Sequence, residues 1–329
     1  MTSEISMAQQ SEWSDVIPKP EYSQKVKIGK INYLPQFEEM MKYFRSVHDN
    51  KEYSERALNL TTNLLKACPG FYTGWHYRAE LLDILKKNLD EELVFLSSLS
   101  LRNHKNYQIW NYRRELIKKI GSCEGEIDFL NIVLDIDCKN IHVWGYRQWL
   151  ITTFNLWDQE YEYVAKLLDE DPYNNSAWSQ RYFLESHSQF YKTSEFEKKN
   201  LEFVLEHCKN IDNECPYNYL KVYYCQELKE RIMQGLVDIA KDKGFSRFLL
   251  QNLGFLYEKD AKGEMCDIVY KKLAKIDFMR KGYWNWKVRR TVRKNIQRTD
   301  NDIWVCRALR DNEEYYNPIY NYYKYSAPQ

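Results

Sequence analysis

A tryptophan recurs along this chain at a nearly fixed interval, and the same residue types accompany it each time. From Trp75 to Trp110, Trp144 and Trp178 the intervals are 35, 34 and 34 residues, and an Arg follows each Trp three positions later. A weaker copy follows, with Tyr217 in place of the Trp. A period of this length is typical of a helix–turn–helix repeat. The chain is therefore expected to be all-α, a solenoid of stacked helical hairpins.

Each repeat is expected to hold two helices, and the second has a recognisable start. An Asn stands four residues before the aromatic residue in four repeats, at Asn106, Asn140, Asn174 and Asn213. Its side-chain oxygen can accept from the free backbone N–H groups of the first helical turn, so these positions are predicted N-caps. Phe71 stands there in the first repeat, so that helix must begin differently.

The Trp and Arg of each repeat are expected to hold neighbouring repeats together. A single helical hairpin cannot bury its own apolar face, so adjacent hairpins must stack. Large aromatic residues dominate such packing, and Trp75, Trp110, Trp144 and Trp178 are predicted to be buried between helices. The guanidinium groups of the Arg residues are predicted to bond carbonyl or carboxylate groups of the next repeat.

Composition excludes several classes of function. The 329 residues carry 48 Lys and Arg against 47 Asp and Glu, so no nucleic-acid partner is expected. The apolar runs are too short for a membrane span, and eight Cys without a CxxC pair indicate reduced thiols in the cytoplasm. There is no phosphate-binding Gly loop, nucleophile elbow or zinc motif, so no metal site is predicted. Such a repeat chain is most often a binding or assembly subunit.

Three regions are expected along the chain. Residues 1–28 are predicted to form a partly disordered N-terminal arm, and residues 29–295 the helical-repeat solenoid. The helical periodicity fades near Arg290, and residues 296–329 are predicted to be a Tyr-rich C-terminal tail.

Several stretches together resemble the α subunit shared by protein farnesyltransferase and geranylgeranyltransferase type I. The repeat itself, Asn-aromatic-x-x-Trp-x-x-Arg, is similar to that of protein prenyltransferase α subunits. The resemblance extends to the segments 13–20, 43–45, 54–58 and 156–183, and to Arg280-Lys281-Gly282-Tyr283-Trp284. It covers roughly residues 13–290 and leaves the Tyr-rich tail unmatched.

The resemblance implies a right-handed α–α superhelix that forms an obligate heterodimer with a prenyltransferase β subunit. The pair would transfer farnesyl, or geranylgeranyl with another β subunit, from the isoprenoid diphosphate to a C-terminal Cys of a CaaX protein such as a small GTPase. It implies zinc bound by the β subunit rather than by this chain, and magnesium with the isoprenoid diphosphate for the farnesyl reaction.

The resemblance also implies site residues on this chain. Lys105 matches a Lys that contacts the isoprenoid diphosphate, and a fixed cation there would stabilise the charge that builds on the leaving group. The substrate-binding region it implies contains His142, Tyr107, Gln108, Tyr72 and Asn140. Because Tyr72, Lys105 and His142 stand in corresponding turns of successive repeats, they are expected to lie along one rim.

Alternatives remain for several of these assignments. Packing between repeats competes with substrate contact for Tyr72 and Tyr107, and a structural hydrogen bond competes for His142. The chain as a whole has two rival interpretations. One is the α subunit of the Rab-directed geranylgeranyltransferase, against which the segments 13–20 and 174–183 argue. The other is a non-catalytic repeat adaptor that binds peptides.

Overall fold

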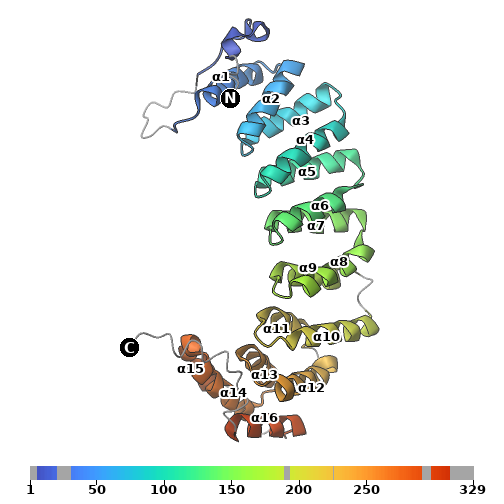
Figure 1. Ribbon diagram of the computed structural model, residues 1–329, viewed down its shortest axis with the longest axis vertical. Helices are drawn as coiled ribbons and strands as arrows, with labels where there is room; N and C mark the ends of the chain where they lie inside the picture. The colour runs from blue at the N-terminus through green and yellow to red at the C-terminus, as the bar shows by residue number, and fades with distance from the viewer. Residues whose placement is uncertain (1–5, 21–30, 189–192, 225, 291–297, 312–329) are drawn as a thin grey trace. The chain divides into compact units, whose positions relative to one another are not determined.

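Paired helices make up the chain, as the computed structural model shows for residues 6–20, 31–188, 193–224, 226–290 and 298–311 (Figure 1). Within these ranges the ordered elements are all helical, which confirms the all-α prediction. The helices divide into two compact units, Met1–Asn155 and Leu156–Gln329.

The first unit begins with two short 3-10 helices and a single α-helix and continues as three hairpins. Its elements are η1 (Met7–Gln9), η2 (Ser11–Trp13), α1 (Pro35–Asp49), α2 (Glu55–Ala67), α3 (Tyr72–Ile84), α4 (Leu89–Arg102), α5 (Tyr107–Ile120), α6 (Glu126–Ile136) and α7 (Ile141–Phe154).

The second unit continues the pairing and ends in one additional helix. Its elements are α8 (Trp157–Glu170), α9 (Asn175–His187), α10 (Ser194–Cys208), α11 (Glu214–Leu220), η3 (Lys221–Tyr223), α12 (Gln226–Lys243), α13 (Arg247–Lys259), α14 (Gly263–Ile276), η4 (Phe278–Arg280), α15 (Lys281–Arg290) and α16 (Asp300–Asp311).

The predicted helix starts are confirmed. The side chains of Asn106, Asn140, Asn174 and Asn213 each accept a hydrogen bond from a backbone N–H in the first turn of the helix that follows. Phe71 occupies the N-cap position of α3 and makes no side-chain capping bond. Each capping Asn has extended backbone angles. The chain is therefore not helical at that residue, and a separate second helix begins after it.

The repeating Trp residues are buried, as predicted, and each makes the same hydrogen bond. Their exposed fractions are 6% or less. Each indole N–H donates to the carbonyl oxygen six residues earlier, at Pro69, His104, Cys138 and Pro172, over 2.8 to 2.9 Å. The Trp therefore ties the second helix of a repeat to the turn that precedes it.

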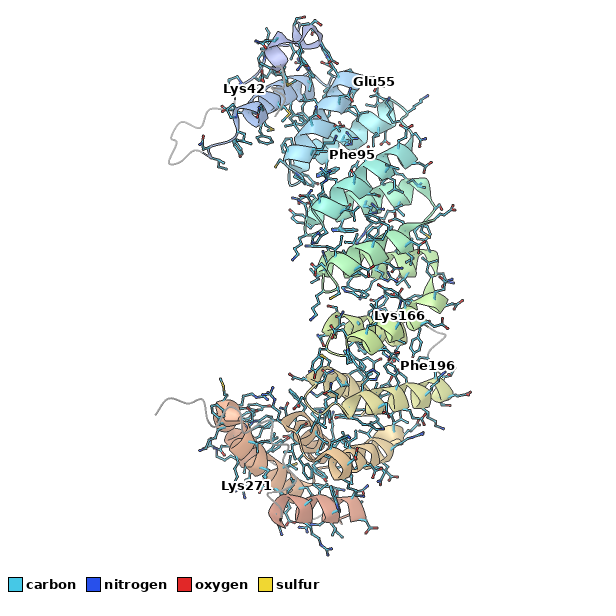
Figure 2. The ribbon with its side chains drawn as sticks, in the orientation of Figure 1. Lys42, Glu55, Phe95, Lys166, Phe196 and Lys271 are labelled. Carbon is cyan, nitrogen blue, oxygen red and sulfur yellow. The ribbon has the colours of Figure 1, made fainter. Side chains whose placement is uncertain are left out.

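The Arg of each of the first two repeats bonds a carboxylate of the next repeat, as predicted, and Arg181 bonds the side-chain oxygen of Asn200 in the repeat that follows. Both nitrogens of the Arg78 fork donate to Glu92, over 2.7 and 2.6 Å, and Arg113 pairs with Glu126 in the same way. Tyr112 and Tyr146 donate to these carboxylates from the following helix. The Arg78 guanidinium also lies 4.4 Å from the ring of Phe95, which Figure 2 labels.

The two ends of the chain contain structure of their own. Trp13 is buried and packs edge-on against Tyr43 of α1, with the ring centroids 5.4 Å apart. At the other end, α16 buries Val305, Cys306, Ala308 and Leu309, and it contacts α12 and α14. This helix begins inside the stretch for which the sequence predicts a Tyr-rich tail; the Tyr-rich part, 312–329, lies outside the described residues.

Candidate functional site

The turns that join the first and second helices of successive repeats lie at the same end of the first unit (Figure 1). The large side chains that begin α3, α5 and α7 are exposed: Tyr72 by 67%, Tyr107 by 63% and Ile141 by 77%. We name the turns that precede α3, α5 and α7 the rim. Exposed apolar residues stand at equivalent positions along it, which makes the rim a candidate binding surface.

Lys105 projects from this rim. Its side chain is 76% exposed, and its Nζ lies 3.5 Å from Oδ2 of Asp137, at the end of α6. His104 approaches the same oxygen, with Nε2 at 3.9 Å. An exposed ion pair of this kind contributes little to stability, so the cation can exchange Asp137 for another anion at small cost.

The backbone beneath Lys105 is held firmly. The carbonyl oxygen of His104 accepts two hydrogen bonds, from the indole of Trp110 at 2.8 Å and from the side-chain amide of Asn140 at 2.9 Å. The first comes from the same repeat and the second from the next one. The turn is therefore fixed from both sides while the Lys105 side chain remains accessible.

Asn140 and His142 occupy the start of α7. Asn140 is only 3% exposed, and its Oδ1 accepts from the backbone N–H groups of His142 and Val143 at 3.0 and 3.3 Å. His142 is half-buried in the first turn of the helix. The side chain of Asn140 thus positions the turn, and His142 lies beside a helix start, where a negative charge is favoured.

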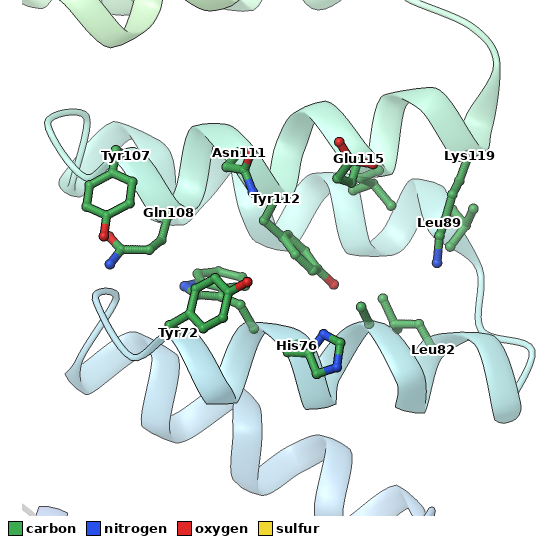
Figure 3. A pocket seen from close by; sticks show the side chains of 13 residues that line it. Tyr72, His76, Leu82, Leu89, Tyr107, Gln108, Asn111, Tyr112, Glu115 and Lys119 are labelled. Atoms are coloured by element: carbon green, nitrogen blue, oxygen red, sulfur yellow. The ribbon is translucent and has the colours of Figure 1, made fainter.

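Three of the predicted residues line one cavity. Tyr72, Tyr107 and Gln108 surround a space of about 400 Å³ between α3 and α5 (Figure 3). The Gln108 amide donates to the carbonyl oxygen of Gly70 at 3.2 Å, across the repeat boundary. Lys105, Asn140 and His142 lie outside this cavity, in the neighbouring turns.

Sequence reasoning missed the remaining polar residues of the cavity. They follow the predicted residues at helical spacing: His76 stands four positions after Tyr72, and Asn111, Glu115 and Lys119 continue from Tyr107 in steps of four. This spacing was the available signal, because residues four apart share one face of a helix. Lys119 extends the row to Asp83 of α3, with Nζ 2.7 and 2.6 Å from its two oxygens.

The inner wall of the cavity is uncharged near neutral pH. Burial raises the pKa of the Tyr112 hydroxyl well above its usual value, and the neighbouring Glu92 carboxylate raises it further. The apolar part of the lining is made by Trp75, Ala79, Leu82, Leu89 and Leu116. An apolar floor with polar groups at its edge is the usual form of a site for an organic ligand or a side chain.

No group of three or more His, Cys, Asp or Glu residues that could hold a metal ion occurs in the part of the chain that the structure describes. Over the same ranges, no helix combines the length and the apolar character that crossing a bilayer requires.

Comparison with known proteins gives consistent matches. The protein prenyltransferase alpha subunit repeat matches residues 54–85, 89–120, 123–154 and 157–188. The chain is 33% identical to the protein farnesyltransferase/geranylgeranyltransferase type-1 subunit alpha of Candida albicans, over 84% of this chain and 96% of that one. It is 35% identical to the Schizosaccharomyces pombe protein of the same name, over 35% of this chain and 40% of that one.

A solved structure matches as well. A chain of the Candida albicans protein geranylgeranyltransferase-I complexed with GGPP superposes with a TM-score of 0.77 and 30% identity, over 86% of this chain and 99% of that one. A geranylgeranyl transferase type-2 subunit matches less of the chain than the Candida albicans protein does: the Arabidopsis thaliana alpha 1 subunit is 30% identical over 27% of this chain and 15% of that one.

Proposed function

Because the chain belongs to the family of α subunits of protein farnesyltransferase and geranylgeranyltransferase type-1, we propose that it is active as one half of a heterodimeric CaaX prenyltransferase. A β subunit covers the rim of the first unit, and the pair transfers farnesyl, or geranylgeranyl with a different β subunit, to the thiol of a C-terminal Cys. Small GTPases with CaaX ends are the expected acceptors, and the cytoplasm is the expected compartment.

The exposure of Lys105 on a fixed turn carries this proposal. When the acceptor thiolate attacks the first carbon of the isoprenoid, the bond to the diphosphate breaks and its oxygens gain negative charge. Lys105 leaves Asp137 and pairs with those oxygens. Because the turn is already held through His104, little reorganisation is needed as the charge develops, and the transition state is stabilised more than the ground state.

The other rim residues bind and orient the substrates. His142, at the capped start of α7, lies on the diphosphate side, and Asn140 holds that helix start in place. Tyr72 and Tyr107 contact the lipid and the peptide, and Gln108 turns its amide from the carbonyl of Gly70 to the peptide carboxylate. An amide suits this role because it donates to a carboxylate without adding charge.

Membership of this family implies two metal ions in the reaction. Zinc, held by the β subunit, would lower the pKa of the acceptor thiol, and magnesium would accompany the isoprenoid diphosphate in the farnesyl reaction. The residues of this chain take part through the leaving group and the positioning of the substrates.

The proposal is tested by co-expression with candidate prenyltransferase β chains, copurification and transfer to a CaaX peptide. We expect a one-to-one complex with zinc-dependent transfer. Lys105→Ala should leave the complex intact and slow turnover by roughly a hundredfold, the lower end of the loss when one donor to a transition-state oxyanion is removed. Lys139→Ala is the matched control, because Lys139 is also exposed and also stands directly before a capping Asn.

Three results would contradict the proposal in whole or in part. A well-behaved monomer that binds no β chain would identify the chain as a repeat adaptor. Turnover that is unchanged in Lys105→Ala would remove the role of Lys105 while leaving the family assignment in place. Transfer to Rab proteins rather than to CaaX peptides would support the type-2 enzyme, whose Arabidopsis thaliana alpha 1 subunit matches 27% of this chain.

A further inference from the structure

The helix α15 presents a face of basic and aromatic residues to solvent. Residues 278–290 contain no Asp or Glu and five Lys or Arg, of which Arg280 and Lys287 pair with carboxylates outside this range, although the whole chain has a net charge of only +1. The exposed aromatic and sulfur-containing side chains in the same stretch are Phe278 (68%), Met279 (83%), Tyr283 (47%) and Trp286 (42%). We name this surface, residues 278–290, the α15 face.

The opposite side of α15 is anchored. Asp277 accepts from the Arg280 guanidinium at 2.6 Å and from the Trp284 indole at 2.9 Å. Trp284 is buried and stacks on Tyr270 of α14, with the ring centroids 5.8 Å apart. Lys287 reaches Glu258 of α13 at 2.9 Å. The helix is thus fixed in orientation, and the exposed residues project from a rigid support.

The exposed residues are arranged by chemical type. Tyr283 and Trp286 are three positions apart and stack with centroids 5.9 Å apart, and Arg290, one turn later, lies over the Trp286 ring at 4.9 Å. Arg289 is exposed beside this row, and Lys281 is exposed at the first position of the helix. Phe278 and Met279 form an apolar tip ahead of the helix. Gly282 stands between this tip and Tyr283 in the sequence, and a Cβ added there would meet no atom within 4 Å.

We propose that the α15 face binds the surface of a membrane that contains anionic phospholipids. Lys and Arg side chains gain energy near such a surface, and Trp, Tyr and Phe insert at the boundary between headgroups and acyl chains. The exposed tip of Phe278 and Met279 favours a membrane over an acidic protein or a nucleic acid, because it gives apolar side chains an apolar phase to enter. The contact is peripheral and reversible.

Vesicle sedimentation tests the inference with the full chain and the β subunit that copurifies with it. We expect binding to vesicles of phosphatidylcholine with phosphatidylserine and little to phosphatidylcholine alone. Lys281→Glu with Arg289→Glu should weaken binding by at least about thirtyfold, since each basic residue near the surface contributes roughly fivefold. Lys198→Glu with Lys199→Glu, two exposed positions on α10, is the control with the same change in charge.

Gly282 provides a second test at one position. Gly282→Trp should strengthen vesicle binding several-fold and Gly282→Glu should weaken it about fivefold. Both should fold, because the site is open and another residue favours the helix over Gly.

Absence of binding to phosphatidylserine vesicles would overturn the inference, as would an equal loss in the α10 control. Binding of an acidic protein or of RNA in place of vesicles would overturn it too. So would vesicle binding that the lone chain shows and that is lost when the β subunit is added, because the β subunit would then cover the α15 face. Prenyl transfer to a soluble peptide should be the same in all these variants, which separates this result from the test of Lys105.

Discussion

Asn140 donates a hydrogen bond across the repeat boundary to the carbonyl oxygen of His104, 2.9 Å away. The Oδ1 atom of the same side chain caps α7 by accepting from the backbone N–H groups of His142 and Val143. The residue preceding the diphosphate candidate Lys105 is therefore held by a residue 36 positions later in the chain. The second unit repeats this contact between Asn213 and Pro172, at 2.6 Å, so it is not confined to one repeat.

Replacing Asn140 should separate its two roles. Asn140→Ala removes both the cap and the bond to His104 and should lower the free energy of unfolding by about 2 kcal/mol. Asn140→Ser keeps a capping oxygen and is too short to reach His104, so it should cost less stability and still raise KM for the isoprenoid diphosphate. Urea unfolding and steady-state kinetics give the two values. Equal stability loss in both variants would contradict the capping role.

The buried ion pair of Arg113 and Glu126 should be sensitive to loss of one partner. Both side chains are 1 to 2% exposed, so Glu126→Ala leaves a buried unpaired guanidinium and should cost about 3 to 5 kcal/mol in urea unfolding. Arg113→Met combined with Glu126→Leu should recover much of this loss. The exposed pair Lys166 and Glu170 is the control, and Glu170→Ala should change stability by about 0.5 kcal/mol or less.

Stability should fall at alkaline pH through the buried tyrosines. Burial raises the pKa of Tyr146, and the Glu126 carboxylate raises it further. A folded-state pKa above the unfolded value of about 10 means that the stabilisation is complete below pH 10 and is lost as pH rises beyond it. Urea midpoints measured from about pH 8 to about pH 11 should decline above pH 10. Tyr146→Phe should reduce the decline; an unchanged slope would rule out Tyr146 as a source.

Thiol labelling should report on the rim. Cys138 is exposed in the turn beside Asp137, whereas Cys208 is fully buried and its burial raises the pKa of the thiol. In the isolated chain a thiol reagent should modify Cys138 rapidly and Cys208 only on unfolding. If a β subunit covers the rim, complex formation should protect Cys138. Peptide mass mapping measures both rates, and unchanged labelling of Cys138 in the complex would place the β subunit elsewhere.

The periodic parts of this molecule follow from the sequence because their causes are local. The Asn caps act within three residues of themselves, and the burial of Trp75 and its equivalents follows from the repeat spacing. The cavity between α3 and α5 does not follow in the same way. His76 and Asn111 line the same cavity only because two helices of different repeats pack side by side.

The sequence pattern also gives no prediction of the helix α16, for a different reason. Its buried face, Val305, Cys306, Ala308 and Leu309, is short and follows the fading of the repeat, so periodicity gives little indication of it. Its position depends on Asp302, which accepts from Lys262 at 2.6 Å, 40 residues earlier. Contacts of that range have no counterpart in a local pattern.

The carboxylate of Glu92 is reached from Arg78, 14 residues before it, and from Tyr112, 20 residues after it. Links this short in sequence give the chain low contact order, for which rapid folding is expected. The hydrogen bonds between one repeat and the next can form as soon as the next repeat has been synthesised. On the ribosome, the first unit can therefore assemble hairpin by hairpin before the end of the chain has emerged.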